Sequence, residues 1–193
     1  MKRRSPKSAL KHRLSDGTVV RLRPIGPDDK PLLEEGMARL SPNSRRLRFM
    51  APVDSLTRAQ LAYLTEIDHR DHVAWGVLCD DDPVAVARMV RLADDPAAAE
   101  LAVTVVDDFQ RRGIARLLIS VMADLARHLG IQRFVFEALP ENDALLKLLG
   151  GFGAEYQLTD GVIAGSINLA GIPAPVLESD PLPLVLRAQQ QAG

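Results

Sequence analysis

Residues 99–115 read AELAVTVVDDFQRRGIA, and this stretch decides the fold. Glu100 to Val106 is a short run rich in β-branched residues, which predicts a strand. Residues 113–129 carry large apolar side chains at helical spacing, and Gly130 follows as a C-cap. The chain therefore passes from a strand, through a short loop, into a helix that begins at Gly113.

The start of this helix is suited to an anion. The first amides of a helix have no intrahelical partners, and the positive end of the helix dipole faces the same way. Gly113 lets a ligand approach the backbone, while Arg111, Arg112 and Arg116 add positive charge. The pattern predicts a pyrophosphate site, although neither G-x-x-x-x-G-K-[ST] nor G-x-G-x-x-G is present.

Moving outward, strands alternate with helices in a way that predicts a mixed α/β fold of one domain. Asp28 can cap a helix that runs to Leu40, Ser41 precedes a second helix, and Thr57 with Gln60 forms a capping box for a third. The remaining elements are expected at 18–23, 73–79, 84–92 and 133–138 for strands, at 141–149 for a helix and at 156–169 for a hairpin.

Composition narrows the class of protein. The 193 residues carry a net charge of -1, which gives no global field to attract nucleic acid or an anionic membrane. The basic start is not followed by an apolar run, so no membrane anchor is expected. A single cysteine, Cys79, excludes an internal disulfide and suits the cytoplasm. No metal site is expected, because Asp80, Asp81 and Asp82 are consecutive residues of a hairpin turn that do not point at one centre.

The two ends of the chain differ in composition from the middle. Residues 1–17 are basic and predict a flexible arm, and residues 18–170 form the domain. Residues 171–193 contain four prolines and end in glutamines, which predicts an irregular or disordered tail.

The strand ending in VTV, the QRRGIA loop and the long helix together resemble the GNAT superfamily of acetyltransferases. Asn142 and the later Gly151-Phe152 are similar to further elements of that superfamily. The stretches RLSPNSRRLRF (39–49), IDHRDHVAWGV (67–77) and AELAVTVVDDFQRRGIA (99–115) resemble the Pat-type bacterial protein lysine acetyltransferases.

The resemblance implies that acetyl-CoA is the co-substrate. Its pantetheine would pair with the backbone of Val103, Thr104 and Val105 in a V-shaped gap of the sheet, and an amide there would polarise the thioester carbonyl. The cofactor-binding residues implied at the helix start are Arg111, Arg112, Gly113, Ile114, Ala115 and Arg116, with Asn142 added from the later motif.

Glu100 matches the general base of the Pat-type family. A lysine attacks a thioester only as a neutral amine, and burial of the site would bring the pKa values of carboxylate and amine together. Because three strand residues span ~10 Å, Glu100 would act through a water molecule or across a β-bulge. The tyrosine that often protonates the departing thiolate is missing between Asn142 and Gly151.

The resemblance implies a protein lysine as acceptor, with acyl-CoA synthetases among the typical targets. Two other functions stay open: acetylation of a small amine, and a non-catalytic acyl-CoA-binding module. His69 and His72 could line the acceptor site or lie in a charged turn, and Tyr63, Tyr156 and Trp75 are expected to be packing residues.

Overall fold

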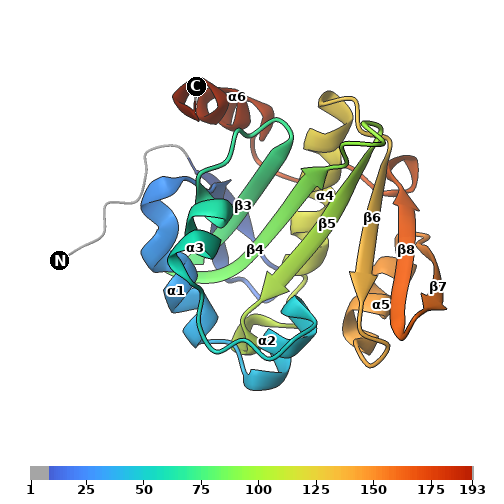
Figure 1. The fold of residues 1–193 in the computed structure, drawn as a ribbon. Helices are drawn as coiled ribbons and strands as arrows, with labels where there is room; N and C mark the ends of the chain where they lie inside the picture. Colours follow the sequence, from blue (N-terminus) through green and yellow to red (C-terminus); the bar gives the residue numbers. More distant parts are fainter. Residues whose placement is uncertain (1–8, 193) are drawn as a thin grey trace.

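The computed structural model describes residues 9–192 and shows one mixed sheet with helices on both faces (Figure 1). The strands are β1 Leu10–Arg13, β2 Val19–Pro24, β3 His72–Cys79, β4 Asp82–Arg91, β5 Ala98–Val105, β6 Arg133–Ala138, β7 Glu155–Thr159 and β8 Val162–Asn168. The helices are α1 Lys30–Ala38, α2 Pro42–Phe49, α3 Arg58–Thr65, α4 Ile114–His128, α5 Asp143–Gly150 and α6 Leu182–Ala192.

The sheet contains one parallel pair, and this pair is incomplete. The strand order is β1-β2-β3-β4-β5-β6-β8-β7, and every neighbouring pair except β5 and β6 is antiparallel. In Figure 1 the two parallel strands lie close at their beginnings and separate toward their ends. The sheet is therefore split at one edge of β5.

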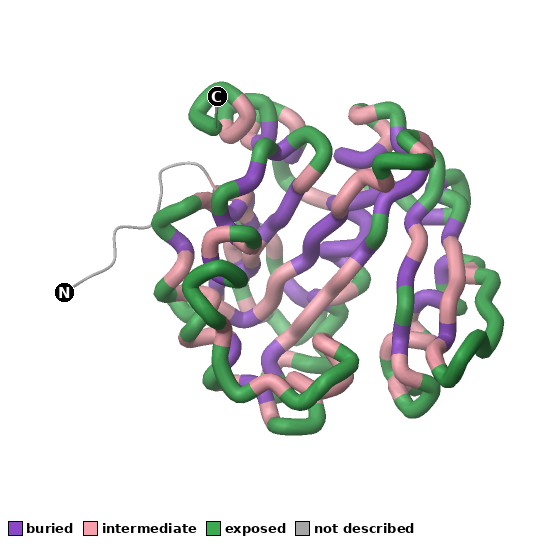
Figure 2. Tube along the Cα trace, viewed as in Figure 1, coloured by how far each residue is buried: buried purple, intermediate pink, exposed green. Residues whose placement is uncertain are grey.

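The core lies mainly between the sheet and α4. Ten of the 15 residues of α4 are buried (Figure 2), and the helix packs on β4 and β5. On the opposite face α1 packs on β4, with α2 and α3 beside it. This packing fixes the position of α4, whose first turn lies at the end where β5 and β6 separate.

Several local predictions from the sequence are confirmed. The Ser41 side chain accepts a hydrogen bond from the Ser44 amide at the start of α2, and Thr57 with Gln60 forms a capping box at the start of α3. Gly130 adopts a φ of 79° just after α4, as a helix C-terminus requires. The prediction that Asp28 caps the first helix is wrong, because a 3-10 turn at Pro27–Asp29 comes first and α1 begins at Lys30.

The turn between β3 and β4 is the hairpin that the acidic run predicts. Asp80 and Asp81 both have positive φ, at 49° and 75°, which is the conformation of a tight hairpin turn. The Arg21 guanidinium forms an ion pair with Asp81. Within residues 9–192 no group of three or more His, Cys, Asp or Glu is placed to hold a metal ion.

Two corrections concern the ends of the chain. Of the expected arm at 1–17, residues 10–13 form β1, which pairs with β2 and buries Leu10, while residues 1–8 lie outside the described part. Of the expected tail at 171–193, residues 172–181 are irregular, but α6 follows and buries Val185 completely. The fold therefore uses more of the chain than residues 18–170.

Candidate active site

The gap between β5 and β6 is the centre of the candidate site. The two strands pair only through residues 98–100 and 133–135, after which β6 continues alongside β8 alone. The Val106 amide donates to the Val84 carbonyl on the β4 side, at 2.9 Å. Because backbone groups alternate along a strand, those of Leu101, Val103 and Val105 face the gap. These groups can pair with an extended ligand.

The loop that follows β5 brings the start of α4 to this gap. Gly113 has a φ of 83° and Arg111 a φ of 59°, so the chain reverses tightly before Ile114 enters the helix. Such turns direct successive backbone N–H groups toward one side and favour an anion there. Arg111, Arg112 and Gly113 are exposed, whereas Ile114 is buried in the core with Ala115 half-buried beside it.

The cations near the helix start differ in their surroundings. Arg112 stacks on the Phe109 ring at 4.7 Å from its centroid and lies 3.5 Å from a carboxylate oxygen of Asp16. Arg116 stacks on the Phe152 ring, 4.6 Å from its centroid. Arg116 therefore lies against the Gly-Phe element at the end of α5, on the far side of the gap.

Asn142 caps α5 and uses its side-chain oxygen to do so. This oxygen accepts a hydrogen bond from the Leu145 amide. The neighbouring Glu141 forms an ion pair with Arg46 of α2 at 2.5 Å. Asn142 therefore starts a helix on the β6 side of the gap, and an ion pair joins that side to α2.

The loop between β5 and α4 is fastened to α2. The Asp107 carboxylate accepts hydrogen bonds from the Ser41 amide and from the Ser41 and Ser44 hydroxyls, at 2.8 to 3.0 Å. Burial acts to raise the pKa of Asp107, but these hydrogen bonds outweigh it and leave the pKa below its usual value. Asp107 therefore holds the loop between β5 and α4 against α2.

Glu100 stands where the gap opens. It is the last residue of β5 that pairs with β6, and its side chain is exposed rather than buried, so the expected burial is not found. The β4–β5 register runs without interruption from Ala85 opposite Val105 to Arg91 opposite Ala99. No β-bulge therefore brings Glu100 closer to the gap-facing amides.

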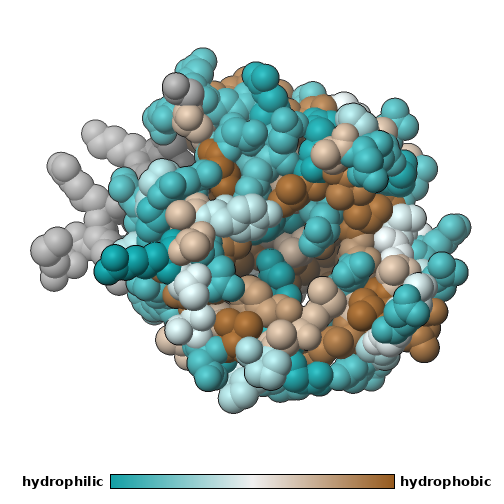
Figure 3. Space-filling view, in the orientation of Figure 1, coloured by the Kyte–Doolittle hydropathy of each residue, from teal (hydrophilic) through white to brown (hydrophobic). Residues whose placement is uncertain are grey.

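A pocket lies on the face of β5 that carries Glu100. It is bounded by α1, α2 and α3, and residues Ala102 and Thr104 of β5 form part of its floor. Figure 3 shows apolar side chains around the hollow on this face of the molecule. Most lining side chains are apolar; Thr104 is polar, and the charged ones are Arg48 and Arg88.

Sequence reasoning missed these two arginines. Arg48 lies at the end of α2 and Arg88 in the middle of β4, so only the folded chain places both in one pocket. A charged residue at a buried position of a strand is unusual, and this was the available signal for Arg88. Arg48 stood inside RLSPNSRRLRF, quoted for its resemblance, without an individual role.

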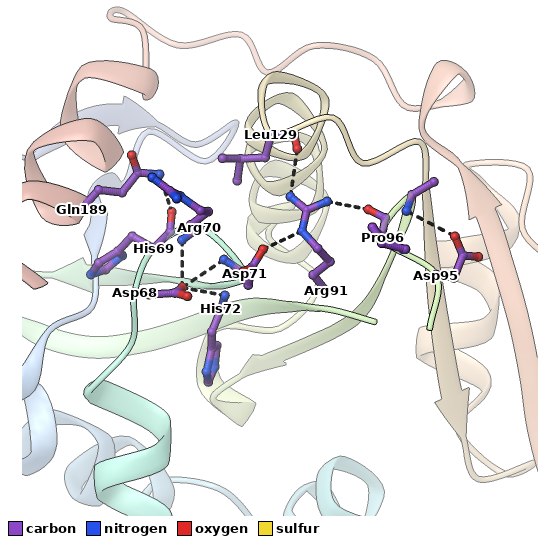
Figure 4. A network of polar contacts seen from close by, with 11 residues as sticks. Asp68, His69, Arg70, Asp71, His72, Arg91, Asp95, Pro96, Leu129 and Gln189 are labelled. Carbon is purple, nitrogen blue, oxygen red and sulfur yellow. Dashed lines mark hydrogen bonds and ion pairs between the residues drawn. The ribbon is translucent and has the colours of Figure 1, made fainter. Parts of the chain in front are cut away.

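The segment before β3 is a tight charged turn, as one of the two readings of its histidines expected. The Asp68 carboxylate accepts hydrogen bonds from the amides of Arg70, Asp71 and His72, at 2.9 to 3.0 Å (Figure 4). His69 is 4% exposed, and its backbone carbonyl accepts a hydrogen bond from the Gln189 side chain of α6. His72 instead contacts Arg88, which lines the pocket.

The tyrosines and the tryptophan are placed differently from one another. Trp75 is completely buried, as expected. Tyr63 and Tyr156, expected as packing residues, are 59% and 47% exposed. Tyr63 stacks on His72 with ring centroids 4.9 Å apart, and Tyr156 lies edge-on to Phe136 on the outer hairpin. Within the described part of the chain, no helix is long and apolar enough to cross a membrane.

The split sheet and the helix start beside it define the class of protein. The family model for the acetyltransferase (GNAT) family matches residues 37–154, and this chain belongs to that family. A crystal structure of the GNAT domain of S. lividans PAT superposes with a TM-score of 0.79 at 31% identity, over 86% of this chain and 99% of that one. The expected fold and family are therefore confirmed.

More particularly, the chain is similar to Pat-type acetyltransferases. It is 34% identical over 164 residues to acetyltransferase Pat of Mycolicibacterium smegmatis, which covers 82% of this chain and 48% of that protein. The cAMP-binding acyltransferase from Mycobacterium smegmatis gives a TM-score of 0.62 at 28% identity, over 96% of this chain and 54% of that one. The chain thus spans about half the length of these two relatives.

Proposed function

We propose that this chain transfers the acetyl group of acetyl-CoA to the side-chain amine of a lysine on another protein, with Glu100 as general base. The observation that carries the proposal is the position of Glu100 at the point where β5 leaves β6. Beyond Glu100, the edge of β5 offers free backbone groups to the donor, and the face of β5 that carries Glu100 forms part of the floor of the pocket.

On the donor side, the chain binds acetyl-CoA through its backbone. The gap-facing groups of Leu101 and Val103 pair with the pantetheine amides, as an added strand would. A backbone N–H in the same run polarises the thioester carbonyl and stabilises the negative charge that develops on its oxygen. The first amides of α4 receive the pyrophosphate, and Arg111 and Arg116 add charge.

On the acceptor side, the amine must lose a proton before it attacks. Reference pKa values are ~10.4 for lysine and ~4.3 for glutamate, so water-like surroundings leave the amine protonated. A docked protein would cover Glu100, and burial disfavours the charged forms of both groups. Glu100 then accepts the proton through a water molecule. A direct transfer is too long, because β5 has no bulge that would bring the Glu100 side chain closer to the gap-facing amides.

The departing thiolate has no dedicated tyrosine in the 142–151 segment. A free thiol has a pKa of ~8.5, so the CoA thiolate is a stable enough leaving group near neutral pH and takes its proton from solvent. We place the reaction in the cytoplasm, which contains acetyl-CoA and keeps thiols reduced. The free Cys79 is compatible with that compartment.

The test uses Glu100→Gln with Glu155→Gln as matched control, because both side chains are exposed and Glu155 lies on the outer strand β7. We expect wild type and control to label lysines of bacterial lysate proteins from radiolabelled acetyl-CoA. Glu100→Gln should lose about 10² to 10⁴-fold in kcat, since general-base catalysis contributes that much. Its acetyl-CoA affinity, measured by calorimetry, should be unchanged.

Three results would count against the proposal. Full turnover in Glu100→Gln would remove the general base. Label on small amines and none on proteins would point to a small-molecule acetyltransferase. Binding of acetyl-CoA with no transfer at all by the wild-type chain would point to a non-catalytic acyl-CoA-binding module.

A further inference from the structure

The pocket beside Glu100 has apolar walls and a positive charge that the surrounding residues do not neutralise. Its walls include Leu33, Met37, Phe49 and Leu64, and its charged lining residues are the two arginines. An apolar wall with an isolated charged group is typical of a binding pocket in which the charge orients the ligand. The partners of each arginine show what charge is left for a ligand.

Arg88 is held rigidly by neutral acceptors. It is 6% exposed; one guanidinium nitrogen donates to the Leu64 carbonyl at 3.0 Å, and another contacts the His72 imidazole. Arginine has only donors, so the His72 nitrogen that faces it is the unprotonated acceptor. Burial and the nearby Arg48 lower the pKa of Arg88 to about 10, which leaves it charged at neutral pH.

Arg48 is the arginine that remains available. Its guanidinium lies 5.1 Å from the centre of the Phe49 ring and makes no hydrogen bond or ion pair with any residue in the range 9–192. Burial lowers the pKa of Arg48, and the negative charge of Glu100 acts in the opposite direction. Phe49 and the end of α2 hold this cation at the pocket.

The charges of the pocket do not balance. Arg48 and Arg88 are cations, Glu100 is the nearby carboxylate, and burial together with Arg88 lowers the pKa of His72 to about 4, so His72 is neutral. One positive charge is left. Arg48 is half-buried, and a partly desolvated cation without an ion pair is costly. A ligand carboxylate would offset that cost while making paired hydrogen bonds with the guanidinium.

We propose that Arg48, supported by Arg88, binds a carboxylate that the acceptor carries close to its reactive amine. This rests on the proposed function and names its substrate class: a lysine with aspartate or glutamate as near neighbours in the polypeptide. The lysine stem lies against the apolar walls, its amine reaches Glu100, and the neighbouring carboxylate meets Arg48. An acceptor with several ammonium groups and no carboxylate fits this pocket poorly, because the arginines repel it.

The test compares two peptides with one lysine each and blocked termini. In the first, the two residues on each side of the lysine are glutamate; in the second, they are glutamine. A hydrogen-bonded ion pair predicts that the wild-type chain prefers the acidic peptide about tenfold in kcat/KM. Arg48→Gln should abolish that preference, so that its kcat/KM is equal for the two peptides, and Arg48→Lys should retain part of it, because the charge stays while the planar fork is lost.

Lys11→Gln is the matched control, since it removes one positive charge from an exposed position on β1. It should keep the wild-type preference, and thermal unfolding of Arg48→Gln verifies that the variant is folded. Equal kcat/KM for the two peptides in the wild type, or an unchanged preference in Arg48→Gln, would overturn this inference alone. If the wild type binds acetyl-CoA but acetylates neither peptide, lysine transfer itself fails and the inference fails with it.

Discussion

At the scale of single residues, His72 shows how the pocket governs a titratable group. Its pKa is lowered to about 4 by burial first and by the positive charge of Arg88 second, although Asp68 acts the other way. The same imidazole supplies an acceptor to Arg88 and stacks on Tyr63. Its neutral form is therefore part of the folded pocket.

The first prediction is a pH dependence of stability. An unfolded histidine has a pKa of ~6.5, so between pH 6.5 and about 4 the unfolded chain binds a proton at His72 that the folded chain does not. The contribution of His72 to stability is complete above pH 6.5 and is lost as the pH falls toward 4. Urea unfolding at pH 7, 6 and 5 should show a steeper decline for the wild type than for His72→Gln, whose amide oxygen can still accept from Arg88. Parallel declines would exclude His72 as the cause.

Prediction from sequence worked unevenly at this scale. Glu100 and residues 103–105 could be proposed from the sequence because they lie in one continuous motif beside a strand–helix junction. The structure places Glu100 at the end of the β5–β6 pairing; the backbone groups of Val103 and Val105 face the gap, whereas those of Thr104 face β4. Arg48 and Arg88 were not found, because their relation depends on α2 folding over β4. Whether Glu100 is exposed or buried could not be decided from the sequence, since exposure is a property of the packed molecule.

At the scale of elements, the start of α4 depends on one backbone conformation. Gly113 has a φ of 83°, and a Cβ built there would meet no atom within 4 Å, so the backbone angle and not crowding requires glycine. The left-handed region costs an ordinary residue roughly 1–2 kcal/mol. The helix start that we propose to bind the pyrophosphate therefore has a backbone conformation that only glycine adopts without strain.

The second prediction is that Gly113→Ala lowers the free energy of unfolding by about 1 kcal/mol, and that it weakens acetyl-CoA binding as the strained turn relaxes. Gly150→Ala is the control, because Gly150 is helical in α5 and also has open space around its Cα. That substitution should be neutral or stabilise by about 0.4–1 kcal/mol. Urea unfolding and calorimetry measure both effects, and equal stability for the two variants would contradict the argument.

The elements themselves divide into those with local causes and those without. The caps at Ser41 and Thr57 were predicted correctly, because a cap involves residues three positions apart. β1 and α6 were missed, because neither has a strong pattern of its own. β1 exists through its pairing with β2, and α6 through burial of Val185 against the main core.

At the scale of the whole molecule, α6 connects the C-terminal part of the chain to the turn at residues 68–72, which comes directly before β3. The helix packs on β2, and the Gln189 side chain donates to the His69 carbonyl at 2.8 Å. His69 belongs to the turn held by Asp68, and that turn leads into His72 at the start of β3 (Figure 4). Contacts therefore run without a break from α6 to the residue that accepts from Arg88.

The last prediction tests whether α6 is an integral part of the fold. Val185 is completely buried, whereas its neighbour Leu186 is 47% exposed, so the two positions form a matched pair on one helix. Val185→Ala removes two buried carbon atoms and should lower the free energy of unfolding by about 2 kcal/mol, including the cavity left behind. Leu186→Ala should change it by less than about 0.5 kcal/mol, as surface substitutions do. Both are measured by urea unfolding at pH 7. Because α6 supports the turn at 68–72, the Val185 variant should also show faster hydrogen exchange at the His72 amide. If both substitutions instead change the free energy of unfolding by equally small amounts, α6 contributes nothing to the folded core.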